Sequence, residues 1–195
     1  MTRAVVGRPA PLGVLLLAIV VVAGLGACGG SDGKRAEPRS WAGTFCRSFS
    51  SYERAVGDLS NRFNETVRSS PAEDLAGRKA ALVDYLSGSI ARTDEFLRAL
   101  NGAGEPKVRD GADLVGNITD GFRDLRTTLA DAGHDAKQLP ESDPAVFGNT
   151  VGRIANLIST GSNRSRETIS RARTQYETRE LDRAFNRAPA CQQIG

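Results

Sequence analysis

The chain is poor in the residues that most often build metal and catalytic sites. Among 195 residues it has one histidine, His134, and three cysteines, Cys28, Cys46 and Cys191. A single histidine cannot supply a multi-histidine metal site, and no Cys-x-x-Cys pair offers zinc ligands at the usual spacing. His134 is expected in a solvated loop. The aspartates and glutamates lie mainly at positions typical of the exposed face of a helix. We therefore expect no enzymatic activity, no metal and no cofactor.

Charged residues are missing from one long stretch near the start of the chain. Arg3 and Arg8 precede an apolar run from Leu12 to Ala27. A basic start, an apolar middle and small residues at the end are typical of a secretory signal peptide. The run closes with Leu25-Gly26-Ala27-Cys28, which resembles the lipobox of bacterial lipoproteins. The resemblance implies that residues 1–27 are cleaved and that Cys28 carries the lipid. The alternative is an uncleaved anchor helix with a chance cysteine.

This resemblance covers residues 1–30 and predicts a location, the extracytoplasmic face of a cell membrane. Loss of Arg3 and Arg8 with the signal lowers the formal net charge of the chain from +3 to +1. A nearly neutral protein lacks the basic field that nucleic-acid binding needs, so no nucleic-acid partner is expected. Arginine far outnumbers lysine, and there is one methionine. This composition is typical of high-G+C actinobacteria, and the helical part resembles their small secreted proteins.

Two cysteines remain once Cys28 is assigned to the lipid. An even pair in an exported chain is more often bridged than free, because the compartment is oxidising. We therefore predict a disulfide between Cys46 and Cys191, with a pair of reactive thiols as the alternative. Closing a loop of about 145 residues contributes at most about 4–5 kcal/mol in the chain-entropy model.

The segment after the lipid site is polar and rich in glycine. Gly29 to Arg39 reads GGSDGKRAEPR, which offers no apolar surface to bury. We predict a disordered tether over residues 28–39, with a reach of about 18 Å for a flexible coil. Residues 40–195 are then the folded domain.

From Trp41 onward, apolar residues recur at intervals of three and four, which predicts helices rather than strands. The first helix is predicted from Trp41 to Val67. The second begins at the capping box Ser70-Pro71-Ala72-Glu73 and ends at Asn101-Gly102. The third begins at Glu105-Pro106 and stops at Gly133, and a loop follows over 134–142. The fourth begins at Asp143-Pro144 and ends before Pro189.

These helices predict an all-α domain, an antiparallel up-down-up-down four-helix bundle. In such a bundle the start of the first helix and the end of the fourth lie at the same end. Cys46 is near the former and Cys191 is just after the latter. The predicted disulfide and the predicted topology therefore support each other.

The apolar pattern of the fourth helix lapses between Ser159 and Asn163. We expect a bend or a short break there. Alternatively, small polar groups line a cavity between helices, which makes Ser159, Gly161 and Ser162 the candidate ligand-binding residues.

The last predicted helix is also rich in arginine, with acids interleaved. Some of these charges have the spacing of helical ion pairs, such as Glu167 with Arg171, and Asp182 lies beside Arg179 and Arg183. This face is either solvated and internally paired, or a contact surface for anionic lipid headgroups or an acidic partner.

Together these features predict a membrane-anchored extracytoplasmic lipoprotein whose helical domain binds a protein or a small ligand. One alternative is a structural cell-envelope protein without a discrete ligand. Another is a carrier of a small apolar ligand.

Overall fold

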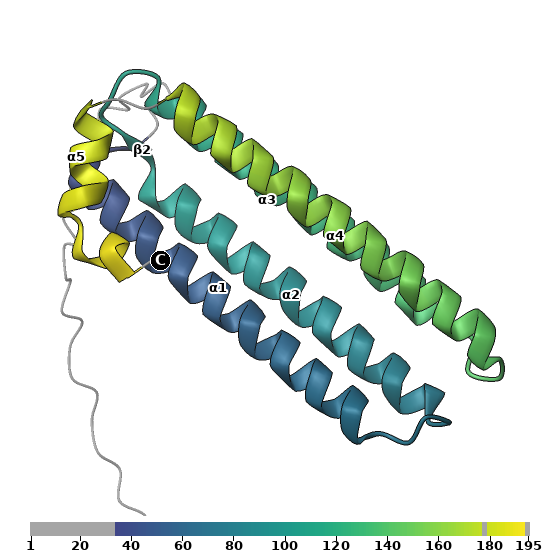
Figure 1. The fold of residues 1–195 in the computed structure, drawn as a ribbon. Helices are drawn as coiled ribbons and strands as arrows, with labels where there is room; N and C mark the ends of the chain where they lie inside the picture. The colour runs from purple at the N-terminus through teal and green to yellow at the C-terminus, as the bar shows by residue number, and fades with distance from the viewer. Residues whose placement is uncertain (1–33, 177–178, 194–195) are drawn as a thin grey trace, which may run out of the picture. The chain divides into compact units, whose positions relative to one another are not determined.

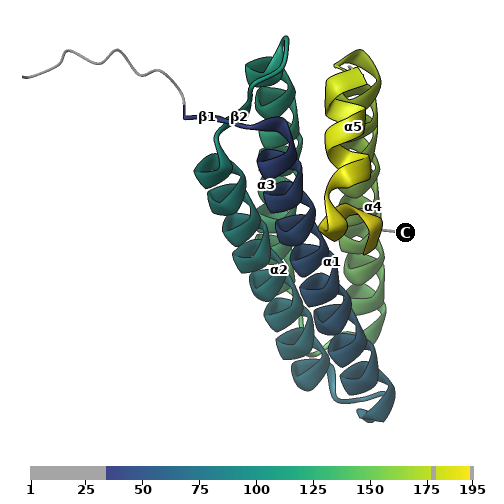
Figure 2. The same cartoon turned by 90° about the vertical axis from the view of Figure 1, so that its left-hand side faces the viewer.

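The domain is all-α, as predicted (Figures 1 and 2). The computed structural model describes residues 34–176 and 179–193. Four long helices are followed by a short helix and a 3₁₀ helix: α1 (Pro38–Ser69), α2 (Leu75–Ala103), α3 (Gly111–Lys137), α4 (Pro144–Gln175), α5 (Arg179–Arg187) and η1 (Pro189–Gln193). Two strands of two residues each, β1 (Arg35–Ala36) and β2 (Glu105–Pro106), pair in parallel. None of the described helices is long and apolar enough to cross a bilayer.

Each long helix packs antiparallel to the one before it (Figure 1). Between α1 and α2, Tyr52 contacts Phe96 and Phe63 contacts Tyr85. Residue numbers therefore rise along α1 as they fall along α2. The turns between α1 and α2 and between α3 and α4 are short, which favours antiparallel neighbours.

An aromatic cluster joins four of the helices. On α1 its rings follow the helical spacing that the sequence shows, and Phe96 of α2 lies 4.3 Å from Phe122 of α3 between ring centroids. Phe185 of α5 makes edge contacts with Trp41 and Phe45. Large rings in such contacts contribute both buried area and preferred geometry. The α1 members are Trp41, Phe45, Phe49 and Tyr52.

Helix α4 runs from Pro144 to Gln175 without a break, so the predicted break near Gly161 is wrong. The buried face continues in small residues instead of large apolar ones. Gly161 is buried, and a Cβ at this position would lie 2.5 Å from Thr128 Cγ2 on α3. Ser165 is buried as well, and its hydroxyl donates to the Gly121 carbonyl at 2.5 Å. The lapse in the pattern therefore marks close packing of α4 on α3.

The predicted fourth helix ends earlier than expected, at Gln175, and the chain continues as α5. Residues 177–178 lie outside the described residues. Phe185 packs on Trp41 and Phe45, Cys191 is bonded to Cys46, and Figure 2 shows α5 running in the same direction as the start of α1. The C-terminal segment therefore lies along the first turns of α1 (Figure 2).

The start of α2 also differs from the prediction. Ser70 is the C-cap of α1, and its hydroxyl donates to the Thr66 carbonyl at 2.7 Å. The N-cap of α2 is Asp74, whose carboxylate accepts from the Gly77 N–H at 2.9 Å. Both Ser and Asp are good N-caps, and the carboxylate at Asp74 is the one that the chain uses.

Helix α3 is shifted toward the C-terminus relative to the prediction. Glu105-Pro106 forms β2, and α3 begins at Gly111. At the other end α3 passes Gly133 and includes His134, which is exposed in the last turn. His134 is therefore helical and does not lie in a loop.

Candidate functional site

Three segments far apart in sequence meet where the described chain begins. We call this region the entry end and define it as residues 34–46, 104–111 and 179–193. The opposite region, the turn end, comprises residues 65–79 and 131–146, which contain the turns between α1 and α2 and between α3 and α4. The entry end is the candidate functional site, because it lies closest in sequence to the predicted lipid site at Cys28. Cys28 itself lies outside the described residues.

A backbone clasp fixes the first described residues. The Glu105 N–H donates to the Lys34 carbonyl and the Lys107 N–H donates to the Ala36 carbonyl, both at 2.9 Å. The Lys107 ammonium lies 2.9 Å from the Glu37 carboxylate. The described part of the predicted tether, 34–39, is thus held by β1, β2 and the start of α1, and the remainder of that tether lies outside the described residues. Pairing with a segment about 70 residues away leaves no periodic signal in the sequence.

Trp41 links this clasp to the core. Its indole N–H donates to the Gly104 carbonyl at 2.9 Å, and its side chain is 1% exposed. Gly104 has φ 70°, a left-handed conformation that favours glycine. A Cβ at Gly104 would overlap the Lys34 carbonyl. Both the backbone conformation and the close approach of β1 therefore require glycine at position 104.

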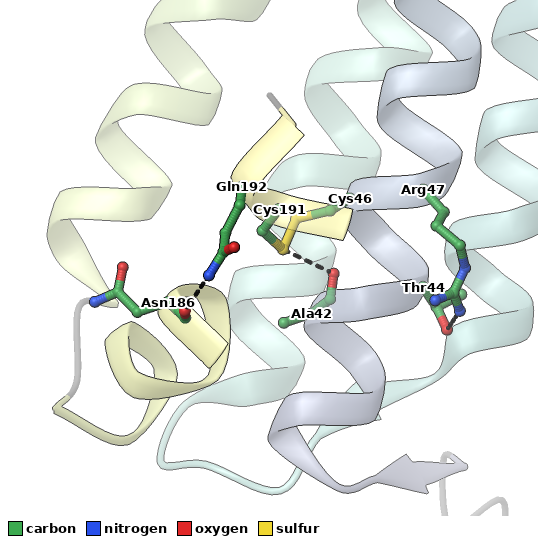
Figure 3. The surroundings of a disulfide bond; sticks show 7 residues. All are labelled: Ala42, Thr44, Cys46, Arg47, Asn186, Cys191 and Gln192. Atoms are coloured by element: carbon green, nitrogen blue, oxygen red, sulfur yellow. Dashed lines mark hydrogen bonds between the residues drawn. A yellow bond between two sulfur atoms is a disulfide. The ribbon is translucent and has the colours of Figure 1, made fainter. Parts of the chain in front are cut away.

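A disulfide joins Cys46 to Cys191, which confirms the predicted bridge (Figure 3). The two residues are separated by 145 positions, and their Cα atoms are 5.0 Å apart. The Cys191 sulfur also lies 3.4 Å from the Ala42 carbonyl oxygen, and the Gln192 amide donates to the Asn186 carbonyl at 3.1 Å. The C-terminal segment is thereby attached to α1 both covalently and by packing.

Two charged hollows open at the entry end and share Glu180. One, of about 570 Å³, is lined by Arg35, Lys107 and Arg109 together with acids. The other, of about 270 Å³, is lined by Arg39, Arg183 and Arg187 with Glu37 and Glu180. Concave surfaces lined by several arginines and lysines can bind anionic groups such as phosphates.

The ion pairs expected within the last predicted helix are not formed. The ion pairs of the described residues do not include Glu167 with Arg171, and they do not include Asp182 with Arg179 or Arg183. The Arg183 guanidinium donates to the Arg179 carbonyl at 2.9 Å instead. The arginines of α5 therefore form no ion pairs with the acidic residues of the same helix.

A separate groove of about 310 Å³ lies between α1 and α2. Tyr52 and Phe96 contribute to it, with Arg47 and Arg92 among the charged lining residues. Burial raises the pKa of Tyr52, and a hydrogen bond with Thr93 opposes that shift. The Tyr52 hydroxyl is therefore neutral at physiological pH. Arg92 forms an ion pair with Glu95 at 2.6 Å, and the Arg47 guanidinium donates to the Thr44 hydroxyl at 3.3 Å.

The structure does not gather the three residues predicted to bind a ligand around an open space. Ser159 is exposed, Ser162 is half-buried and Gly161 packs against Thr128. A ligand site at these residues stays a prediction, and the close contact at Gly161 weighs against a cavity there.

Comparison with known proteins gives no further assignment. No family model matches the chain, and no curated protein or solved structure matches it. Among the residues that the structure describes, no group of three or more His, Cys, Asp or Glu side chains could hold a metal ion. Function is therefore inferred from the residues and their geometry.

Proposed function

We propose that this protein is a lipoprotein, anchored by acyl chains on Cys28 to the extracytoplasmic face of a bacterial cell membrane. The observation that carries the proposal is Leu25-Gly26-Ala27-Cys28 at the end of an uncharged apolar run. The disulfide between Cys46 and Cys191 supports it, because such bonds persist mainly in oxidising compartments outside the cytoplasm.

We further propose that the anchored domain is an up-down-up-down four-helix bundle, extended by α5, that binds an extracytoplasmic partner. The antiparallel packing of successive long helices supports this topology. The contact of Gly161 with Thr128 favours a protein partner over a small ligand held at Ser159 to Ser162. A structural envelope role is the alternative and differs by having no discrete partner. Enzymatic activity forms no part of the proposal.

The anchor is tested by replacing Cys28. Membrane fractions from cells that produce the wild type should contain a chain that starts at Cys28 and carries acyl groups, measured by intact mass. The Cys28→Ala variant should be unprocessed or released, because three acyl chains at about 0.8 kcal/mol per buried CH₂ account for retention. Cys191→Ser is the matched control and should keep the acyl groups. A free Cys28 thiol on a membrane-bound, full-length chain would contradict the anchor.

The binding role is tested on the detergent-extracted protein. Mass spectrometry should find a stoichiometric partner or ligand with the wild type. Gly161→Leu should displace a small molecule held between α3 and α4, whereas Gly152→Leu should not, since a side chain at Gly152 meets open space. A protein partner should be retained by both variants. If nothing is retained at stoichiometric amounts by the wild type, the structural role is the better assignment.

A further inference from the structure

We propose that the entry end docks on an anionic bilayer surface, with its two charged hollows facing the lipid headgroups. This inference rests on the proposed lipid anchor at Cys28. It adds a defined orientation of the domain and names the residues that hold it.

The first step is the length of chain between the lipid and the fold. Five residues, 29–33, separate Cys28 from Lys34, where the clasp begins. Fully extended, six Cα–Cα steps span at most roughly 22 Å. Helix α1 starts at Pro38 and has 32 residues, which at 1.5 Å per residue gives a length of about 48 Å. The entry end is therefore confined near the bilayer, while the turn end can lie a full helix length away.

The second step is the distribution of charge between the two ends. The entry end has eight Lys and Arg residues and five Asp and Glu residues. The turn end has four basic residues and seven acidic ones. The end that the short segment holds near the membrane is thus the positive one. An anionic bilayer attracts the entry end and repels the turn end, which favours one orientation.

The third step is the availability of the positive groups. Lys107 and Arg109 are paired with Glu37 and Asp110. Five exposed arginines of the entry end make no ion pair with any described acid: Arg35, Arg39, Arg179, Arg183 and Arg187. Guanidinium groups bind phosphate oxygens in a bidentate manner, so the four of these arginines that line the two hollows are the residues that would contact lipid phosphates.

The fourth step is the shape of the surface. Arg39, Arg183 and Arg187 line one hollow, and Arg35 lines the neighbouring one. The disulfide and the contact of Phe185 with Trp41 hold α5 against α1, so the arginines of the two segments keep a fixed arrangement. An acidic protein could also bind such a surface. The short segment after Cys28 favours the bilayer, because it leaves little room for a protein between the two.

The test uses the full, lipidated protein in vesicles. A dye is attached at Ala112→Cys, an exposed position that lines the first hollow, or at Ser142→Cys in the turn end. Quenching by a nitroxide on the lipid headgroup reports proximity to the membrane. With phosphatidylglycerol in the vesicles, the dye at position 112 should be quenched several-fold more than the dye at 142. Raising the salt from about 0.05 M to about 0.5 M, or using phosphatidylcholine alone, should lower the quenching at position 112 to the level that the short segment after Cys28 gives without electrostatic attraction.

A triple variant should lose the salt-sensitive quenching at position 112; it combines Arg39→Gln, Arg183→Gln and Arg187→Gln. A second triple variant is the control and should keep the salt-sensitive quenching. It removes the same charge from exposed positions farther along α1, with Arg54→Gln, Arg62→Gln and Arg68→Gln. Quenching at position 112 that is as strong on phosphatidylcholine vesicles as on phosphatidylglycerol vesicles, or an equal loss in both triple variants, would overturn the docking. Retention of the protein on vesicles at high salt reports the anchor separately. A protein that lacks acyl groups and washes off in salt would overturn the anchor, and with it the inference.

Discussion

The two ends of the domain are built in opposite ways. At the turn end, each turn joins neighbours in sequence, local groups complete the helix termini, and a surface ion pair between Lys79 and Glu141 at 2.9 Å links the two segments. Asp143 accepts from the N–H groups of Ala145 and Val146, as Asp74 does from Gly77. At the entry end, segments from the start, middle and end of the described chain are joined by a backbone clasp, an indole hydrogen bond and a disulfide.

The stability of the entry end should therefore depend on residues that are far apart in sequence, and that of the turn end mainly on local ones. A local cap contributes about 1 kcal/mol, and its loss affects one helix terminus. A contact between distant segments orders several elements together, so its loss should be larger and more cooperative. Variants at the entry end should therefore lose more stability than variants at the turn end.

The largest effect should follow removal of the disulfide. For the separation of 145 residues, the chain-entropy model gives a loss of up to about 5 kcal/mol in the free energy of unfolding for Cys46→Ser with Cys191→Ser. Thermal unfolding followed by circular dichroism should show a marked fall in Tm. Reduction of the wild type should reproduce it, while reduction of the double variant should change nothing. An unchanged Tm would show that the bridge does not stabilise the entry end.

The next effect should come from Trp41. Trp41→Ala removes a fully buried ring and the donor to Gly104, so we expect a loss of about 3–5 kcal/mol. Trp41→Phe keeps most of the apolar volume and should cost less, leaving the Gly104 carbonyl without the indole donor. Urea unfolding of both variants checks this. Equal losses would mean that the hydrogen bond, rather than the ring, carries the stabilisation.

A smaller effect is expected between the two ends, at the contact of α3 with α4. Gly161→Ala places a methyl group against Thr128, and overpacking of this kind costs about 1–3 kcal/mol. Gly152→Ala on the same helix meets open space and should stabilise by about 0.5–1 kcal/mol through helix propensity. Opposite signs in urea unfolding would confirm close packing at Gly161. A stabilising Gly161→Ala would contradict it.

The smallest effect should be at the turn end. Asp74→Ala removes the N-cap of α2 and should cost about 1 kcal/mol. Asp74→Asn is the matched control, since it keeps a capping oxygen, and it should retain most of the stability. Ser70→Ala should leave the start of α2 unchanged, because Ser70 does not cap that helix. A larger loss for Ser70→Ala than for Asp74→Ala would contradict the cap assignment.

Local patterns in the sequence predicted much of the fold. The spacing of apolar residues on α1 predicted a helix that contains the aromatic ladder from Trp41 to Tyr52. The disulfide followed from cysteine parity and the expected topology, although Cys191 reaches Cys46 by way of α5 running parallel to α1. These predictions succeed because the spacing of apolar residues and the number of cysteines can both be read from a single sequence.

The remaining features depend on contacts that no local pattern records. The buried face of α4 continues through Gly161 and Ser165, which are too small to register as apolar, although their spacing from Ile154 and Ile158 is helical. The clasp at Lys34 depends on the conformation of Gly104. The sequence signal at this position is a glycine followed by Glu105-Pro106, and the same signal also predicts a helix start.

The position of the disulfide also determines how the chain would carry mechanical tension. Because Cys46 and Cys191 are bonded, residues between them form a closed covalent loop. Tension applied between the two ends of the chain would pass from α1 through the sulfur atoms to η1, and it would bypass all of α2, α3 and α4. Under such a load, only the clasp and the first turns of α1 could unfold, because the disulfide at Cys46 would then transmit the tension directly to Cys191. The helices inside the loop would stay folded while the segment that precedes them is stretched.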